Sequence, residues 1–135
     1  MYAVIDTNVI VASLKTRHHD SATVRVMDAV YSGQVTPIVN DEILAEYREV
    51  LKRPRLKLDP AKCEYIIALI DDLAERFAPA SSEMPMPDED DRVFFEVALA
   101  GLGVADTRLV TGNIKHYPPI DFVVSPAEFC DILGI

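Results

Sequence analysis

Cysteine and positive charge are both scarce in this sequence. Only two of the 135 residues are cysteines, Cys63 and Cys130, and neither lies in a CxxC or Cys/His motif. This absence speaks against a zinc site and a disulfide framework, so we expect both thiols to be buried as small hydrophobic groups. With 13 Lys and Arg against 22 Asp and Glu, the net charge is -9. General electrostatic attraction to nucleic acid is thereby excluded, although a local basic patch is not.

Long hydrophobic segments are also missing. The longest apolar stretch, Val93 to Leu99, is interrupted by Glu96 and falls far short of the roughly 20 residues that a membrane span needs. No basic segment followed by an apolar one opens the chain, so we predict no signal peptide and expect a cytoplasmic protein. The content of 50% apolar and 26% charged residues is typical of a folded globular protein. The length predicts one domain over residues 1–135.

Hydrophobic periodicity predicts strands that alternate with helices. We expect strands at residues 2–5, 35–39, 108–111 and 121–124. We expect helices at residues 7–15, 20–32, 41–53, 61–77, 91–102 and 126–133, with a proline-rich loop over residues 78–88. This alternation predicts an α/β fold with three α/β/α layers around a mostly parallel central sheet of four to five strands.

Asp6 stands between two apolar segments, residues 2–5 and 9–14, where a strand is expected to give way to a helix. Open α/β sheets bind ligands at the carboxyl ends of their strands, which is where Asp6 should lie. The alternative is that Asp6 only caps the following helix. Position thus makes Asp6 the first candidate for a site residue.

Glu46 is the second candidate. On a helical wheel it lies about 100 degrees from the centre of the apolar face of helix 41–53, whereas Asp41, Glu42 and Glu49 lie roughly 120 to 160 degrees away. Glu46 is therefore the acid of this helix that is best placed to reach the edge of the core. The alternative is a solvated glutamate.

Asp91 is the third candidate. It shares a helical face with Phe94, Phe95 and Leu102, so it is expected to point inward. The alternative is that the acidic run 88–91 serves only to cap the helix and to interact with its dipole. Because neighbouring exposed acids can do that capping, we favour a site role for Asp91.

Carboxylates gathered in one cleft raise one another's pKa, and a divalent cation removes this conflict. Oxygen ligands without a His or Cys cluster favour Mg²⁺ or Mn²⁺ over zinc. Such an ion, held by Asp6, Glu46 and Asp91, would polarise a phosphodiester and lower the pKa of a bound water. Two ions would also stabilise the leaving oxygen.

Four sequence blocks resemble those of PIN-domain nucleases, most closely the branch of toxin components of toxin-antitoxin systems. The blocks are V-I-D-T-N-V at Val4 to Val9, E-I-L-A-E-Y-R-E-V-L at Glu42 to Leu51, D-R-V-F-F-E-V-A-L-A at Asp91 to Ala100 and A-D-T-R-L-V-T-G-N at Ala105 to Asn113. With the S-P-A-E-F at Ser125 to Phe129, the resemblance covers nearly the whole chain. It implies a Mg²⁺- or Mn²⁺-dependent endoribonuclease with a parallel sheet, whose acidic positions are Asp6, Glu46 and Asp91. Dimers are common in that family, which makes a homodimer an expectation by analogy.

The fourth block departs from the family pattern. Asn113 stands where many relatives carry an acid, and His116 stands where others have an Asp. Asn113 follows the strand at 108–111 and should reach the same edge as Asp6, where its amide oxygen could bind a metal or a metal-held water. A neutral side chain weakens a second metal site. Asp106 precedes this strand and is expected to lie at the opposite end in a structural role.

RNA binding is predicted for four basic residues just beyond the helix that carries Glu46: Lys52, Arg53, Arg55 and Lys57. They could form a phosphate-contacting rim, extended by residues 17–19 and 115–116. The alternative is a solvated helix end that favours cations. No aromatic platform for single-stranded nucleic acid is evident, so the sequence indicates no base preference.

Three functions compete. The leading hypothesis is a metal-dependent endoribonuclease that acts as the toxin of a toxin-antitoxin pair and is restrained by an antitoxin protein. The second is a catalytically weakened PIN-fold module that binds RNA or protein, which Asn113 motivates. The third, an aspartyl-nucleophile phosphatase, requires a second Asp two residues after Asp6, where this chain has Asn8.

Overall fold

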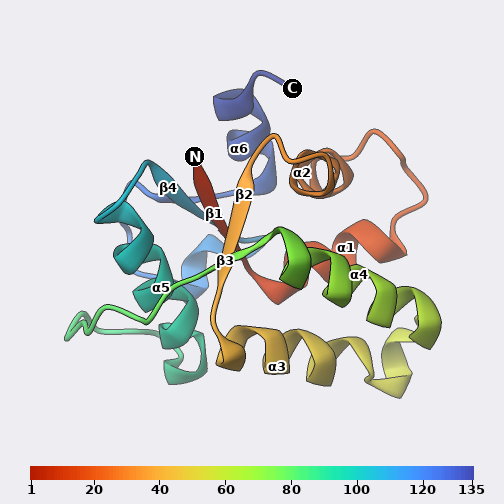
Figure 1. Ribbon diagram of the computed structural model, residues 1–135, viewed down its shortest axis with the longest axis horizontal. Coiled ribbons are helices and arrows are strands. Elements are labelled where there is room, and N and C mark those ends of the chain that lie inside the picture. The colour runs from red at the N-terminus through yellow and green to blue at the C-terminus, as the bar shows by residue number, and fades with distance from the viewer.

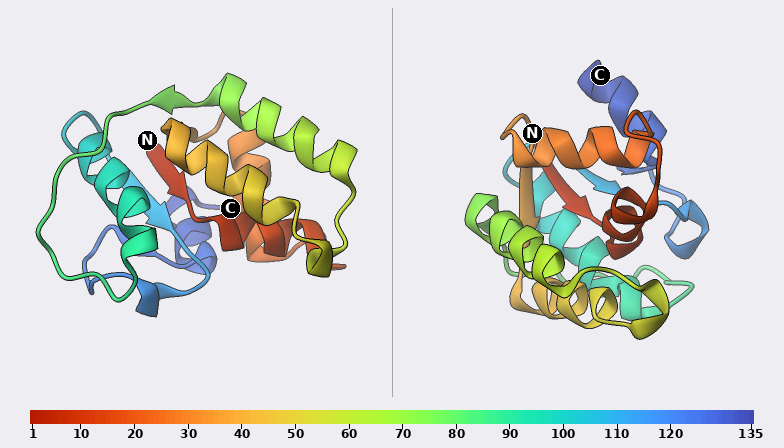
Figure 2. Two further views of the ribbon diagram at one scale, coloured as in Figure 1. Left: turned by 90° about the horizontal axis from the view of Figure 1, so that it is seen from below. Right: turned by 90° about the vertical axis from the view of Figure 1, so that its right-hand side faces the viewer.

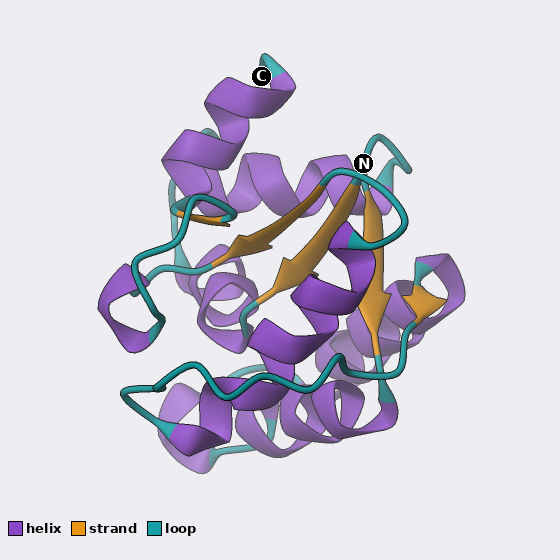
Figure 3. Cartoon of the chain, turned by 90° about the vertical axis from the view of Figure 1, so that its left-hand side faces the viewer, coloured by secondary structure: helices purple, strands orange, loops and turns teal.

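A computed structural model of the protein describes residues 1–135 and places a five-stranded sheet at its centre. All pairs of neighbouring strands are parallel, in the order β3-β2-β1-β4-β5. The strands are β1 (Tyr2–Ile5), β2 (Thr36–Val39), β3 (Glu75–Arg76), β4 (Thr107–Val110) and β5 (Val123–Val124). The arrows of the three longer strands, β4, β1 and β2, run side by side toward the same end of the sheet in Figure 3.

Helices cover both faces of this sheet. The α-helices are α1 (Thr7–Lys15), α2 (Ala22–Tyr31), α3 (Asp41–Leu51), α4 (Pro60–Leu73), α5 (Arg92–Leu102) and α6 (Pro126–Leu133). Three short 3-10 turns join them: η1 (Pro54–Leu56), η2 (Glu89–Asp91) and η3 (Ile114–His116). Helix α5 packs on one face, α1, α2 and α4 lie on the other, and α3 lies across the lower end of the sheet (Figures 1 and 2). The predicted three-layer α/β/α class with a parallel sheet is thereby confirmed.

The chain order places a switch point beside β1. From β1 the chain passes through α1 and α2 to β2 on one side, and it later returns through α5 to β4 on the other side of β1. Connections that leave on opposite faces open a crevice at the carboxyl ends of the strands. Residues that directly follow β1 and β4 therefore meet at this edge.

Close packing of α5 against the sheet requires a glycine. A Cβ at Gly101 would lie 2.6 Å from Ile38 Cδ1 and 2.8 Å from Thr107 Oγ1. The absence of a side chain therefore lets α5 sit directly on β2 and β4.

The largest correction concerns the predicted helix 61–77. Helix α4 ends at Leu73, and residues 75–76 form β3, the fifth strand, in register with Ile38 and Val39 of β2. Phe77, whose spacing fits the helical stripe, instead donates its backbone N–H to the Val39 carbonyl and packs edge-on against Tyr2. Pairing with β2 outweighs the local helical pattern here, because hydrophobic spacing alone does not distinguish a helix end from a short edge strand.

Smaller differences lie at element boundaries. Helix α3 ends at Leu51 rather than Arg53, and the predicted helix 91–102 begins at Arg92 after the 3-10 turn η2, so that Asp91 becomes its N-cap. Cys63 and Cys130 are free and buried, as expected from their isolated positions.

The longest helix, α4, has 14 residues, and none of the helices is long and apolar enough to cross a membrane.

Candidate active site

Asp6 lies at the crevice beside β1 and is almost fully buried, with 6% of its surface exposed. One of its carboxylate oxygens, Oδ2, accepts two hydrogen bonds, from Thr111 Oγ1 at 2.9 Å and from Tyr117 Oη at 3.0 Å. The Asp6 side chain makes no capping bond to α1. The alternative interpretation as a plain helix cap therefore lacks the hydrogen bond that would define it.

The loop after β4 is held against Asp6 by Asn8. Asn8 Oδ1 accepts the Gly112 N–H at 2.9 Å, and Asn8 Nδ2 lies 3.4 Å from Thr111 Oγ1. A Cβ at Gly112 would lie only 3.2 Å from Asn8 Oδ1, so a glycine permits this close approach. Asn8 thus links the first turn of α1 to the residues that orient Asp6.

Helix α3 brings Glu46 to the same edge. Glu46 Oε2 accepts a hydrogen bond from Thr7 Oγ1 at 2.6 Å, and Thr7 directly follows Asp6. The next residue, Tyr47, is buried and donates its hydroxyl to the Ile5 carbonyl at 2.6 Å, at the end of β1. These two contacts fix α3 relative to Asp6.

A Tyr47→Phe substitution should therefore destabilise the fold by about 1 to 2 kcal/mol, because it leaves the buried Ile5 carbonyl without its partner. Urea unfolding of Tyr47→Phe measures this loss. Tyr65→Phe is the matched control, since Tyr65 is 69% exposed and should unfold like the wild type. Equal midpoints for the two variants would show that the Tyr47 bond does not hold α3 in place.

Asp91 comes from the opposite face of the sheet. As the N-cap of α5 its carboxylate makes no bond to the backbone, and the side chain is only 16% exposed. His116 Nδ1 lies 3.6 Å from Asp91 Oδ2, while Asn113 Nδ2 lies 2.9 Å from His116 Nε2. Asn113 thus reaches Asp91 only through His116, whose two ring nitrogens face these two side chains.

The three acids influence one another electrostatically. Burial, followed by the charges of Asp6 and Asp88, raises the pKa of Asp91 to about 6, and His116 partly offsets this rise. Burial also raises the pKa of Glu46, while the hydrogen bond from Thr7 opposes the rise and the charge of Asp6 adds to it. Negative charge is thus concentrated where three structural elements meet.

The chemistry of these donors fits a hard divalent cation, because they offer only oxygen ligands in a site where their own charges are unfavourable. As arranged, no group of three or more His, Cys, Asp or Glu side chains is close enough to hold a metal ion. Repulsion between the ionised carboxylates favours this separation, and a bound cation would remove it. The residues present therefore suit such an ion, because their ligand atoms are oxygens and their carboxylates are negatively charged.

The predicted site residues lie as follows. Asp6 lies close enough to Glu46 and to Asp91 for its charge to raise the pKa of both. Asn113 reaches the same edge but contacts His116 rather than the acids. Asp106 precedes β4, at the other end of the sheet, and forms an ion pair with Arg108. The metal-binding and catalytic roles assigned to these residues stay predictions.

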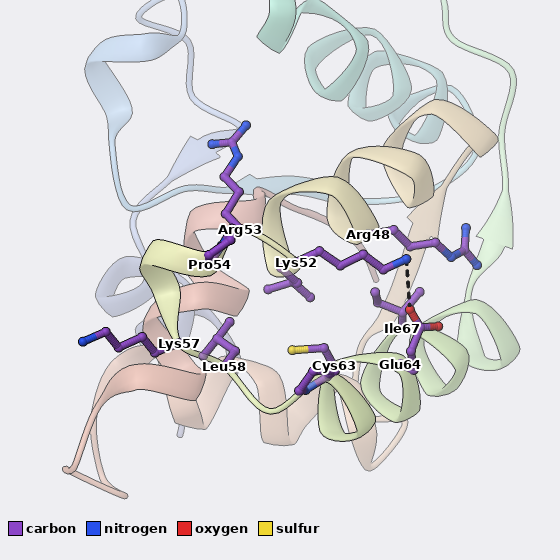
Figure 4. A pocket seen from close by; sticks show the side chains of 11 residues that line it. Arg48, Lys52, Arg53, Pro54, Lys57, Leu58, Cys63, Glu64 and Ile67 are labelled. Carbon is purple, nitrogen blue, oxygen red and sulfur yellow. Dashed lines mark ion pairs between the residues drawn. The ribbon is translucent and has the colours of Figure 1, made fainter.

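Three of the four basic residues predicted to bind RNA line one cavity. Lys52, Arg53 and Lys57 line a cavity between α3 and α4, whereas Arg55 does not line it (Figure 4). Arg53 also forms an ion pair with Glu49 at 2.8 Å. Their role in binding RNA stays a prediction.

Thr111 and Tyr117 are the residues that sequence reasoning missed. Thr111 could have been found from strand register, because Ile5 pairs with Val110 and the next residues, Asp6 and Thr111, must then be neighbours. Tyr117 carries no such signal. It reaches Asp6 only because the turn η3 folds back over the end of the sheet.

Comparison with known families gives one match, in which the PIN domain corresponds to residues 2–115. This range contains Asp6, Glu46, Asp91 and Asn113 and ends just before His116. Searches among curated proteins and among solved structures found no match. The match confirms the resemblance to PIN domains, while the toxin branch stays a prediction. The chain therefore belongs to the PIN-domain family, whose members are generally nucleases.

Proposed function

We propose that the protein is a divalent-metal-dependent endoribonuclease and the toxin of a toxin-antitoxin pair. The observation that carries the nuclease proposal is the meeting of Asp6, Glu46 and Asp91, which come from β1, α3 and α5, at the carboxyl edge of a PIN-type sheet. The sequence resemblance supports the toxin role, an antitoxin partner and a homodimer. The cytoplasmic location is proposed because the sequence predicts no signal peptide.

In this proposal Asp6, Glu46 and Asp91 hold Mg²⁺ or Mn²⁺. Such an ion, when bound, supplies a water of lowered pKa and neutralises charge on the phosphate. Hydrolysis forms a bond from the water oxygen to phosphorus and breaks the bond from phosphorus to a ribose oxygen. The water gives up a proton, and the leaving oxygen takes one.

The protein's own groups prepare this reaction by fixing the carboxylates. Thr111 and Tyr117 both donate to Asp6 Oδ2, which leaves Oδ1 free of protein donors and sets the plane of the carboxylate. Thr7 orients Glu46 in the same way. The pKa of Asp91 is near 6 in the metal-free protein, so protonation of this carboxylate competes with metal binding, and the affinity for the ion should fall below about pH 6.

Metal removal tests the proposal directly. Purified protein with Mg²⁺ or Mn²⁺ should cleave single-stranded RNA, and an excess of EDTA should reduce cleavage to the background of a protein-free sample. Readdition of Mn²⁺ should restore it. Cleavage that is unchanged by EDTA would contradict a metal-dependent mechanism, and no cleavage with either ion would contradict the nuclease.

The alternative is a PIN-fold module that binds RNA or protein without cleaving it. Asn113 favours this alternative, because it adds no charge at the fourth position and contacts His116 instead of the acids. Calorimetric titration with Mn²⁺ separates the two functions. A nuclease should show saturable binding that Asp91→Asn weakens, whereas a module that binds no metal should show none.

A further inference from the structure

A cavity of about 320 Å³ opens between α3 and α4, beside the candidate active site. Its floor is aliphatic and includes the buried side chains of Leu51, Cys63 and Ile67. In Figure 4 the sulfur atom of Cys63 points into this space. The floor therefore offers an apolar surface to a flat or compact group.

Positive charge dominates the rim of this cavity. Arg48, Lys52, Arg53 and Lys57 line it together with one acid, Glu64, in a protein whose net charge is -9. Lys52 lies 3.7 Å from Glu64, whereas Arg48 and Lys57 form no ion pair. A ligand that is both apolar and anionic would match this combination.

Lys57 also has an unusual backbone conformation. Its φ of 54° lies in the left-handed region, and it is the one residue other than glycine with a positive φ. Such a conformation costs of order 1 kcal/mol and tends to occur where a side chain serves a function. Here it ends the turn η1; Lys57 lines the cavity, and in Figure 4 its amino group points outward from it.

The cavity begins at the C-terminal end of α3, the helix that also carries Glu46. From Glu46 to Leu51, the last residue of α3, the helix axis rises about 7.5 Å, and Arg53 follows two residues later, outside the helix. The charge of Arg53 is felt at Glu46, where it favours the ionised carboxylate. Figure 4 shows Arg53 extending out of the cavity, away from its apolar floor.

We propose that this cavity binds one unstacked nucleobase of a single-stranded RNA substrate, with the flanking phosphates on Lys52, Arg53 and Lys57. This inference rests on the proposed nuclease function. The volume is at the lower end of the range for small-ligand pockets, which suits a nucleotide and excludes an α-helix about 10 Å wide. A base can enter only after leaving its stack, so the substrate class is single-stranded RNA.

An abasic scan of the substrate tests this subsite with the wild-type protein. A short single-stranded RNA is mapped for its cleaved bond, and single bases are then removed one at a time. A stacked strand rises 3.4 Å per nucleotide, so the sensitive position should lie within about three nucleotides of that bond. Removing that base should lower kcat/KM about ten-fold, and removing any other should have little effect. Equal cleavage of all the RNAs would overturn the subsite.

Filling the cavity provides an independent test. Cys63→Met should lower kcat/KM for the intact RNA about ten-fold and abolish the further effect of removing the sensitive base, since the two changes delete the same contact. Ala61→Met is the matched control, because Ala61 is an exposed residue of α4 that does not line the cavity, and the change adds a methionine without altering the charge. Additive effects of Cys63→Met and base removal would contradict the proposal. Thermal unfolding establishes whether each variant folds. If Cys63→Met does not fold, the abasic scan with the wild-type protein is the test of the subsite.

Binding measurements separate this subsite from the nuclease proposal. Fluorescence anisotropy with labelled RNA and metal-free protein should show about ten-fold weaker binding of the sensitive abasic RNA. If that loss occurs without any cleavage, the subsite stands and the nuclease proposal fails. If RNA is cleaved without base dependence, the nuclease proposal stands and the subsite fails. A third outcome would contradict the subsite. If a Glu- and Leu-rich peptide binds the wild type but not Cys63→Met, while both proteins bind RNA equally well, the cavity is a protein-docking site.

Discussion

An Asp6→Asn variant is expected to lose metal-dependent RNA cleavage by at least about 100-fold, which is the scale for removing one preorganised electrostatic group from an active site. The substitution keeps the shape of the side chain, and the amide oxygen can still accept the bonds that Thr111 and Tyr117 donate to Oδ2. The change removes the charge with which Asp6 would bind a cation. Cleavage rates measured in Mg²⁺ and in Mn²⁺ give the size of the loss.

Asp106→Asn is the matched control for this prediction. It makes the same chemical change before β4, at the opposite end of the sheet, where Asp106 pairs with Arg108. Cleavage by this variant should equal that of the wild type. Undiminished cleavage by Asp6→Asn, in a preparation free of other nucleases, would remove Asp6 from the proposed mechanism.

Much of the candidate site was predictable because it depends on local patterns. Asp6 follows a buried strand, and the helical wheel turns Glu46 toward the core boundary and Asp91 toward the packed face of α5. Parallel strands present their carboxyl ends at one edge, so the meeting of these residues follows once the fold class is known. Helix spacing and strand order together therefore locate the acids.

The remaining features depend on contacts between distant segments. Tyr117 reaches Asp6 through the fold of η3, and β3 exists because Glu75 and Arg76 pair with β2. The cavity lined by Lys57 depends on how η1 and the residues around it connect the end of α3 to the start of α4, which no periodicity describes. Sequence patterns therefore predicted the charged groups but missed the hydroxyl groups that orient them and the apolar floor beside them.

Asp91→Asn is expected to stabilise the metal-free protein at neutral pH while removing stabilisation by metal. Burial and the neighbouring acids raise the pKa of Asp91 to about 6, from 3.8 for an unperturbed Asp. A raised pKa means that ionisation opposes folding. The penalty is absent well below pH 4, grows between about pH 4 and 6, and is complete above pH 6.

The difference between the two pKa values of Asp91, about 6 and 3.8, corresponds to a loss of at most about 3 kcal/mol in the free energy of unfolding. Because the side chain is partly exposed, we expect Asp91→Asn to gain about 1 to 2 kcal/mol at pH 8. Asparagine is as good an N-cap as aspartate, so the start of α5 should not suffer. Urea unfolding of the wild type and variant should therefore give a difference at pH 8 that vanishes near pH 4.

Divalent metal should make the wild type more stable than Asp91→Asn. An ion that binds only the folded protein stabilises it in proportion to its affinity, so Mn²⁺ should raise the unfolding midpoint of the wild type more than that of Asp91→Asn. Asp90→Asn is the control, because Asp90 is the exposed neighbour and should change neither the pH dependence nor the response to Mn²⁺. If Asp91→Asn and Asp90→Asn respond alike to pH and to Mn²⁺, Asp91 neither opposes folding by its charge nor binds the ion. A gain in metal-free stability that Mn²⁺ cancels would instead show that this carboxylate is retained at a cost to folding for the sake of binding a cation.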